Sequence, residues 1–169
     1  MSSPATSSAF TRHLLHQYDL VHGMLGRLAE DFSEEEATRP AGDMKPLVWY
    51  LGHVAITDNY LLTLYGGETA AISEEHIKRF GRGSDGHADF SDASKAQMVE
   101  LLATLSGRVH ALVSTLEPDD LDRETTEKTA HPVFKTLGGA FSLVIAHCAY
   151  HGGQVGDLRR ALGKDALFG

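Results

Sequence analysis

The sequence predicts an all-α protein, a four-helix bundle formed by a single domain over residues 10–169. Apolar residues recur every three to four positions in four long segments, which is the period of a helix packed along one side. No segment shows the alternation of apolar and polar residues that is typical of a half-buried strand. A length of 169 residues suits one domain with a sizeable core. Residues 1–9 are expected to form a disordered N-terminal tail.

The first predicted helix spans residues 10–32. Tyr18 fills one turn of its apolar stripe, whose other members are Phe10, Leu14, Val21, Leu25, Leu28 and Phe32. The segment SEEEATRPAGDMK that follows contains Pro40 and Gly42, which are typical of a loop.

The second predicted helix covers the segment PLVWYLGHVAITDNYLLTLYGG. It begins at Pro46, because proline suits the first turn of a helix. It ends at Gly66 and Gly67, because glycine suits the position after the last turn. One face carries a stripe made of Trp49, His53, Ile56, Tyr60 and Leu64.

A polar, glycine-rich connection over residues 66–91 is expected to contain one short helical turn in SEEHIKRF. The third predicted helix follows Ser91 and ends at Pro118. Ser91 and Ser94 are candidate N-caps, because a serine hydroxyl accepts a free backbone N–H of the first turn. The polar segment EPDDLDRETTEKTAH separates this helix from the last one.

The last predicted helix begins near Pro132 and ends at Gly163. The connection between the second and third helices decides the topology. At about 3.3 Å per extended residue, roughly 24 residues reach much farther than the ~30 Å length of a 20-residue helix. A crossover along the bundle is therefore feasible, and we expect an up-down-down-up arrangement rather than up-down-up-down.

The net charge of −8 argues against non-specific binding to nucleic acid or to anionic lipid, because both need a positive surface. No apolar run of about 18 residues predicts a membrane span. The start, MSSPATSSAFTR, lacks the pattern of a secretory signal. The single cysteine, Cys148, cannot form an internal disulfide, and this fits a reducing cytoplasm.

Two histidines, His147 and His151, lie four residues apart on the core-facing stripe of the last helix, and His53 lies on the inner stripe of the second. Three neutral imidazoles can bind one divalent ion and leave a position open for water or substrate. The alternative from spacing alone is that these are buried histidines bonded to serine, threonine or backbone groups. We therefore identify His53, His147 and His151 as candidate metal ligands.

Other polar residues receive weaker interpretations. The remaining seven histidines are expected on the surface or in loops, although His16 or His22 could approach the cavity. Asp58 and Gln154 are candidates to orient an imidazole. Cys148 is expected to pack away from the site. No acidic residue stands out as a general base on an inner stripe.

The residues also resemble a known family. The segments PLVWYLGHVAITDNYLL, RFGRGSD and HCAYHGGQVGDLRRALG are similar to the DinB-like superfamily of metal-dependent proteins, and the resemblance covers residues 10–169. Its motif is a histidine in the second helix followed about ninety residues later by HxxxH, then GQ and a basic pair. His53, His147 and His151 match it, with Arg159 and Arg160 as the basic pair.

The resemblance implies an up-down-down-up bundle, a dimer, and a divalent ion that is nickel, zinc or iron. Some members of the family are thiol-dependent isomerases or S-transferases. It therefore implies a metal-dependent enzyme that activates a thiol or a water, with a low-molecular-weight thiol and a small molecule as substrates. The alternatives are a metal-dependent hydrolase and a non-catalytic metal-binding or interaction bundle. Met24 and Leu112, apolar residues beside the inward stripes, support a homodimer.

Overall fold

The computed structural model describes residues 8–86, 88–125 and 132–167. Most of the predicted N-terminal tail therefore lies outside the described residues. Ala9, the last residue of that tail, is instead the first residue of α1, and the hydroxyl of its N-cap Ser8 accepts the backbone N–H of Thr11. Serine is among the most favourable residues for this capping role.

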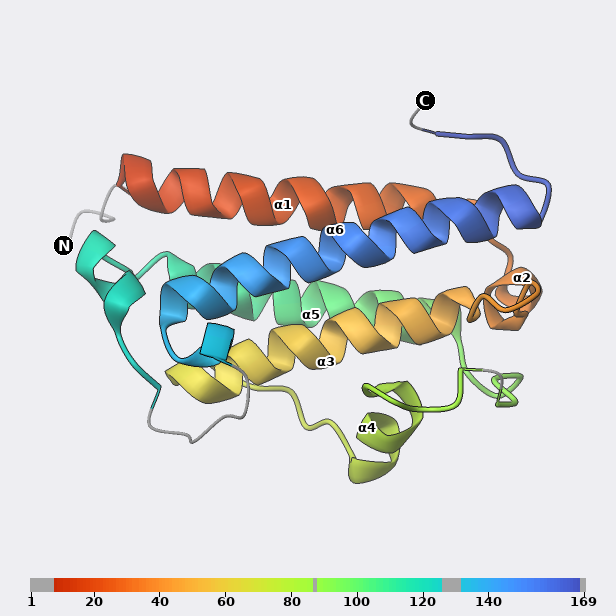
Figure 1. The fold of residues 1–169 in the computed structure, drawn as a ribbon, viewed down its shortest axis with the longest axis horizontal. Helices are drawn as coiled ribbons and strands as arrows, with labels where there is room; N and C mark the ends of the chain where they lie inside the picture. The colour runs from red at the N-terminus through yellow and green to blue at the C-terminus, as the bar shows by residue number, and fades with distance from the viewer. Residues whose placement is uncertain (1–7, 87, 126–131, 168–169) are drawn as a thin grey trace, which may run out of the picture.

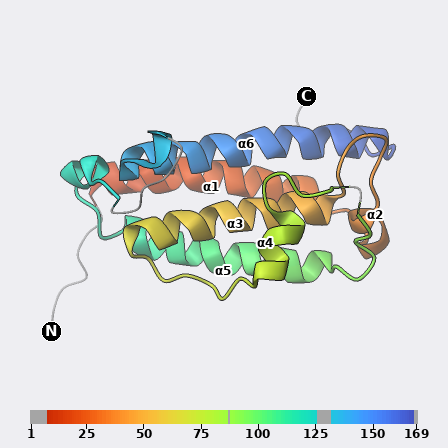
Figure 2. The same cartoon turned by 60° about the horizontal axis from the view of Figure 1, so that its bottom comes forward.

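Four long helices lie side by side along one axis (Figures 1 and 2). They are α1 (Ala9–Ala29), α3 (Leu47–Tyr65), α5 (Lys95–Val113) and α6 (Leu137–Ala161). One apolar core runs between them, and its fully buried members include Leu25, Leu61, Leu105 and Leu158. The prediction of an all-α four-helix bundle is confirmed.

The predicted ends of α3 are close to those in the structure, whereas α5 is shorter than predicted: it begins at Lys95 and ends at Val113, and Pro118 begins a separate 3-10 helix. α3 follows Pro46 and stops at Gly66, which has a left-handed φ of 76° and donates its backbone N–H to the carbonyl oxygen of Leu62. Glycine adopts this conformation at little cost because it has no Cβ. Ser94, rather than Ser91, caps α5 by accepting the N–H of Gln97.

Within the described ranges, four short elements connect the long helices: α2 (Glu34–Thr38), α4 (Glu74–Phe80) and the 3-10 helices η1 (Pro118–Asp122) and η2 (Pro132–Phe134). The expected helical turn in residues 66–91 is α4, and it packs on α3. The segment predicted as a loop after α1 contains a further helix, α2. The reason is a capping box, in which Ser33 accepts the N–H of Glu36 and the Glu36 carboxylate accepts the N–H of Ser33.

The last helix begins later than the sequence predicts. Pro132–Phe134 form a separate 3-10 turn, and the Thr136 hydroxyl accepts the N–H of Gly139 at the start of α6. The C-terminal end of α6 agrees with the prediction to within two residues, because α6 stops at Ala161 and Gly163 follows with a φ of 77°.

Polar contacts fix which helix ends meet. Lys95, at the start of α5, donates from Nζ to the carbonyl oxygens of Ala29, Glu30 and Phe32 at the end of α1. Arg159, near the end of α6, is buried and forms an ion pair with Asp31.

Polar contacts also join helix ends at the opposite end of the bundle. Thr11, in the first turn of α1, donates from its hydroxyl to the carbonyl oxygen of Leu116, just after α5. The Tyr65 hydroxyl, at the end of α3, donates to the carbonyl oxygen of Phe134, just before α6. Within the described ranges, no helix has the length and apolar character needed to cross a bilayer.

Candidate metal centre

The three histidines singled out in the sequence meet between α3 and α6. The Nε2 atom of His147 lies 3.1 Å from Nε2 of His53 and 3.1 Å from Nε2 of His151. The potential ligand atoms of the three side chains all lie within 4.8 Å of one another. The one-turn spacing of His147 and His151 and the packing of α3 on α6 bring the rings to this point.

The outer nitrogens of two of these rings are held by oxygen atoms. Nδ1 of His53 lies 2.7 Å from the carbonyl oxygen of Phe80, at the end of α4. Nδ1 of His151 lies 2.6 Å from Oε1 of Gln154. Because these oxygens can only accept, each Nδ1 carries the proton and each Nε2 is left with a free lone pair. The expectation that Gln154 orients an imidazole agrees with this contact.

His147 completes the cluster but leaves its polar atoms poorly satisfied. Its Nε2 can donate at most one proton, although two acceptor nitrogens face it. Its Nδ1 is buried and has no hydrogen-bond partner among the described residues. A buried polar nitrogen without a partner is costly. A cation bound by all three Nε2 atoms would accept the lone pairs that now face one another, so the donor set fits a divalent ion that prefers imidazole ligands.

Burial keeps these imidazoles neutral. It lowers the pKa of His147 to about 3, assisted by the neighbouring His151 and His53. It lowers the pKa of His151 to about 4, against the opposing effect of the hydrogen bond to Gln154. Burial also lowers the pKa of His53. Neutral imidazole is the form that binds a metal, so protons do not compete for these atoms near neutral pH.

Aromatic side chains surround the cluster. The Trp49 ring stacks on His53 with centroids 4.5 Å apart and planes 18° apart, and its Nε1 donates to the Ser84 hydroxyl over 2.8 Å. The Tyr50 ring is buried with its centroid 5.7 Å from that of His151. Tyr150 is exposed, and its ring centroid lies 5.1 Å from that of His151. These rings restrict the orientation of the imidazoles.

Two contributors to the site were missed by reasoning from the sequence. The Phe80 carbonyl oxygen is a backbone atom, so no residue type marks it in advance. Lys45 lies just before α3 with its Nζ 3.5 Å from the centroid of the Trp49 ring, and its charge contributes to the lowered pKa of His53 and His151. The sequence pattern that could have identified Lys45 is its position four residues before Trp49, a spacing that brings two side chains close together.

A second polar cluster corrects two expectations. Asp58 is fully buried, and its Oδ2 accepts from the Tyr18 hydroxyl over 2.8 Å and from Nε2 of His22 over 3.0 Å. An acidic residue therefore does lie inside the bundle, and His22 is not a surface histidine. Asp58 contacts α1 rather than the three histidines, so the idea that it orients one of them is not supported by any contact.

His22 is positively charged in this cluster. Burial acts to lower its pKa, but hydrogen bonds to Asp58 and Cys148 and the charge of Asp58 outweigh burial and raise the pKa to about 10. Nδ1 of His22 also lies 3.1 Å from the Tyr18 carbonyl oxygen, so both ring nitrogens face acceptors. Cys148 is buried within this cluster, away from the three-histidine site as expected.

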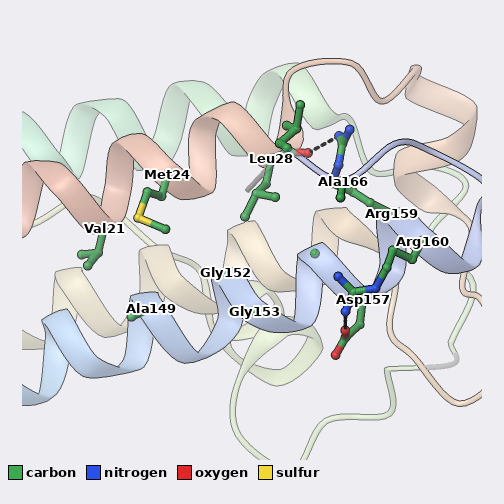
Figure 3. Close-up of a pocket in the computed structure, with 12 residues that line it drawn as sticks. Val21, Met24, Leu28, Ala149, Gly152, Gly153, Asp157, Arg159, Arg160 and Ala166 are labelled. Atoms are coloured by element: carbon green, nitrogen blue, oxygen red, sulfur yellow. Dashed lines mark hydrogen bonds and ion pairs between the residues drawn. The ribbon is translucent and has the colours of Figure 1, made fainter. Parts of the chain in front are cut away.

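A separate cavity lies between α1 and α6. Its volume is about 440 Å³, and Ala166 and Leu167 of the C-terminal segment are among the residues that line it. Figure 3 shows the residues that line this cavity. None of the three clustered histidines lines it. Its walls are mostly apolar or small side chains, including Val21, Met24, Leu28, Ala149, Gly152 and Gly153.

The chain is similar to several solved structures, among them one from Enterococcus faecalis and one from Bacillus subtilis. A conserved protein from Enterococcus faecalis is 18% identical, with a TM-score of 0.69, over 91% of this chain and 98% of that one. YfiT from Bacillus subtilis is described as a probable metal-dependent hydrolase with an unusual four-helix bundle topology. It is 20% identical, with a TM-score of 0.65, over 98% of this chain and 95% of that one. At these identities the likeness shows the fold alone, and no curated protein matches the chain.

A comparison of the sequence with protein-family models identifies the family of the chain. The profile of the DinB superfamily matches residues 17–155 and so reaches all four long helices. The matched region contains His53, His147 and His151, and it confirms the resemblance seen in the motifs around them. The chain belongs to the DinB superfamily.

Proposed function

We propose that the protein is a divalent-metal-dependent enzyme that activates a thiol or a water at His53, His147 and His151, and that it acts as a thiol-dependent S-transferase. The convergence of three neutral Nε2 atoms, two of them fixed as lone-pair donors, carries this proposal. The cluster found in the described residues contains no fourth histidine, cysteine or carboxylate. Three neutral ligands leave the charge of the ion undiminished and a coordination position for substrate, as in catalytic rather than structural sites.

The side chains have separate roles in this proposal. A bound ion would lower the pKa of a coordinated thiol or water and so supply a nucleophile near neutral pH. His53, His147 and His151 would hold that ion. The Phe80 carbonyl and Gln154 fix the tautomers of His53 and His151, which is the usual role of groups hydrogen-bonded to metal ligands. Zinc, nickel and iron all accept imidazole ligands.

The second candidate function is metal-dependent hydrolysis. The description of YfiT as a probable metal-dependent hydrolase favours it, because that protein has a similar fold. The same three histidines would then activate water instead of a thiol. A non-catalytic metal-binding bundle is the third candidate. For the thiol-dependent S-transferase, the proposed substrates are small-molecule electrophiles and low-molecular-weight thiols.

The three functions are separated by one set of assays. Metal-free protein is reconstituted with zinc, nickel or iron, and thiol consumption with a chlorodinitrobenzene electrophile is measured beside hydrolysis of a nitrophenyl ester. We expect at least about a 100-fold faster thiol transfer with metal than without, because metal activation is worth several kcal/mol. The same gain should be absent in His151→Ala and present in His13→Ala, which changes an exposed histidine.

Equal rates of thiol transfer with and without metal, over several thiols and electrophiles, would remove the transferase proposal. Metal-dependent ester hydrolysis alone would leave the hydrolase. Metal binding without either reaction would leave the binding bundle.

We also infer the up-down-down-up topology. The contacts of Lys95 with the end of α1 and of Thr11 with the end of α5 support opposite directions for these helices. The contact of Tyr65 with Phe134 supports opposite directions for α3 and α6. The course of the ribbon agrees, with α3 and α5 running the same way (Figure 1).

A homodimer is the proposed assembly. Leu20 and Met24 on α1 are 56% and 40% exposed, and Met24 borders the cavity between α1 and α6. Light scattering at tens of micromolar should give twice the chain mass of 18.3 kDa. Met24→Glu should shift the mass towards the monomer, whereas Ile77→Glu, at an exposed position on α4, should not. A monomeric wild type would contradict the proposal.

A further inference from the structure

Two residues, Trp49 and Gly86, hold the Lys45 side chain beside the three-histidine centre. Its Nζ lies 3.5 Å from the centroid of the Trp49 ring. Its stem also packs against buried Gly86, where an added Cβ would lie only 2.2–2.4 Å from Cγ, Cδ and Cε of Lys45. The aliphatic stem of Lys45 therefore occupies the space that a side chain at residue 86 would need.

The groups that hold Lys45 are themselves tied to the centre. The Trp49 ring stacks on His53, and Trp49 Nε1 donates to the Ser84 hydroxyl, two residues before Gly86. The first turn of α3 and residues 84–86 thus form a support for one ammonium group at the edge of the imidazole cluster. A stem packed in this way loses little further freedom when the ammonium binds a ligand.

Within the part of the chain that the structure describes, no carboxylate pairs with the Lys45 ammonium. The acidic residue whose charge acts on it is exposed Asp85. Lys45 is half-buried, which makes an unpaired charge costly. A divalent ion on the histidines would add more positive charge, so the centre as a whole favours an anionic ligand.

We propose that Lys45 is a specificity-determining residue that binds a carboxylate of the substrate while another group of the same molecule occupies the three-histidine centre. This inference rests on the proposed function, because it requires an ion on His53, His147 and His151. The substrate class is then a small carboxylate-bearing molecule, for example a thiol with a carboxylate near its sulfur. A positioned ammonium recognises a carboxylate through a charge-assisted hydrogen bond.

The test compares two thiols on cobalt-loaded protein, where sulfur-to-cobalt absorption reports binding without any reaction. Mercaptoacetate carries the carboxylate, and 2-mercaptoethanol lacks it. We expect the ratio of their dissociation constants to change by about tenfold between wild type and Lys45→Met, and to be largely retained in Lys45→Arg. Because the ratio is compared between variants, the different intrinsic acidities of the two thiols cancel.

Two further variants sharpen the test. Gly86→Ala keeps the lysine but displaces its stem, so it should also lose the preference for mercaptoacetate. Lys78→Met, at an exposed position on α4, is the matched control and should behave as wild type. Melting temperatures show that each variant is folded, and Lys45→Gln replaces Lys45→Met if the latter does not fold.

The outcomes distinguish this inference from the proposed function. An unchanged ratio in folded Lys45→Met overturns the role of Lys45 and leaves the metal centre in place. If the wild-type protein gives no cobalt absorption, or gives absorption that persists when the three histidines are replaced, the proposed function is overturned, and the role of Lys45 with it. A tenfold change in Lys45→Met and Gly86→Ala, but not in Lys78→Met, supports the inference.

Discussion

Zinc at about a hundredfold excess over its dissociation constant should raise the free energy of unfolding of the wild type by about 2.7 kcal/mol. For a domain of this size, that corresponds to a rise in melting temperature of roughly 5–10 °C. His53→Ala, His147→Ala and His151→Ala should each lose most of this gain, because each removes one of the three facing Nε2 atoms. Thermal melting with and without zinc or nickel measures the effect.

The control for this series is His13→Ala, which removes an exposed histidine on α1 and should gain as much as the wild type. The three ligand variants should remain folded without metal, because the bundle is held by an apolar core that does not include these histidines. If they gain as much from metal as the wild type does, His53, His147 and His151 are not the binding site.

The stability of the metal-free protein and its binding of metal should both depend on pH in a defined way. In the unfolded chain these histidines titrate near 6.5, whereas in the folded protein without metal the pKa is about 3 for His147 and about 4 for His151. Between these values the unfolded state binds more protons, so the metal-free protein should lose stability as pH falls below about 6.5. Metal should still bind to the folded protein at pH 5, where ordinary surface histidines are protonated. Loss of the metal close to pH 6.5 would contradict the buried, neutral cluster.

Asp58→Ala should destabilise the protein by about 3–5 kcal/mol, as expected when one partner of a buried ion pair is removed. The substitution leaves the Tyr18 hydroxyl and Nε2 of His22 without the carboxylate oxygen that both contact inside the bundle. Urea denaturation of the metal-free protein measures the change. Asp19→Ala removes an exposed carboxylate of α1 that pairs with His110, and it should cost less than about 0.5 kcal/mol.

The contribution of the His22–Asp58 pair to the free energy of unfolding should also depend on pH. Because the folded pKa of His22 is raised to about 10, its stabilisation is fully present below pH 6.5 and is lost as pH rises through 10. The difference between wild type and Asp58→Ala should therefore shrink between neutral and alkaline pH. A cost below about 1 kcal/mol at pH 6 would show that the buried contacts do not form a charged pair.

The long helices could be predicted because each buries one continuous stripe, which leaves a clear period in the sequence. The short elements could not, because their stability depends on particular polar contacts. Pro40 and Gly42 obscured α2, although Ser33 and Glu36 carry the capping-box pattern. At the start of α6, Pro132 suggested a first turn, but the cap is Thr136. Both turns form in the structure, because Pro132–Phe134 make a 3-10 helix of their own ahead of the start of α6 at Leu137.

The candidate site was predictable to the extent that it follows helix geometry. The spacing of His147 and His151 and the stripe containing His53 indicated three converging rings. The Phe80 carbonyl and the support of Lys45 by Gly86 depend on how the connection after α3 folds back, and this leaves no period in the sequence. The buried position of His22, in contrast, could have been predicted from the sequence. It lies four residues after Tyr18, which already filled a turn of the inner stripe, so the two share one face of the helix.

The separation of the clustered histidines along the chain has a kinetic consequence. His53 and His147 are 94 residues apart, so an ion bound by both is a crosslink across more than half of the polypeptide. By chain entropy, closing a loop of this size is worth about 4–5 kcal/mol in a covalent crosslink. Helix α6 cannot leave α3 while the crosslink persists. The lifetime of the loaded protein against heat or proteases is therefore limited by the rate at which the ion dissociates.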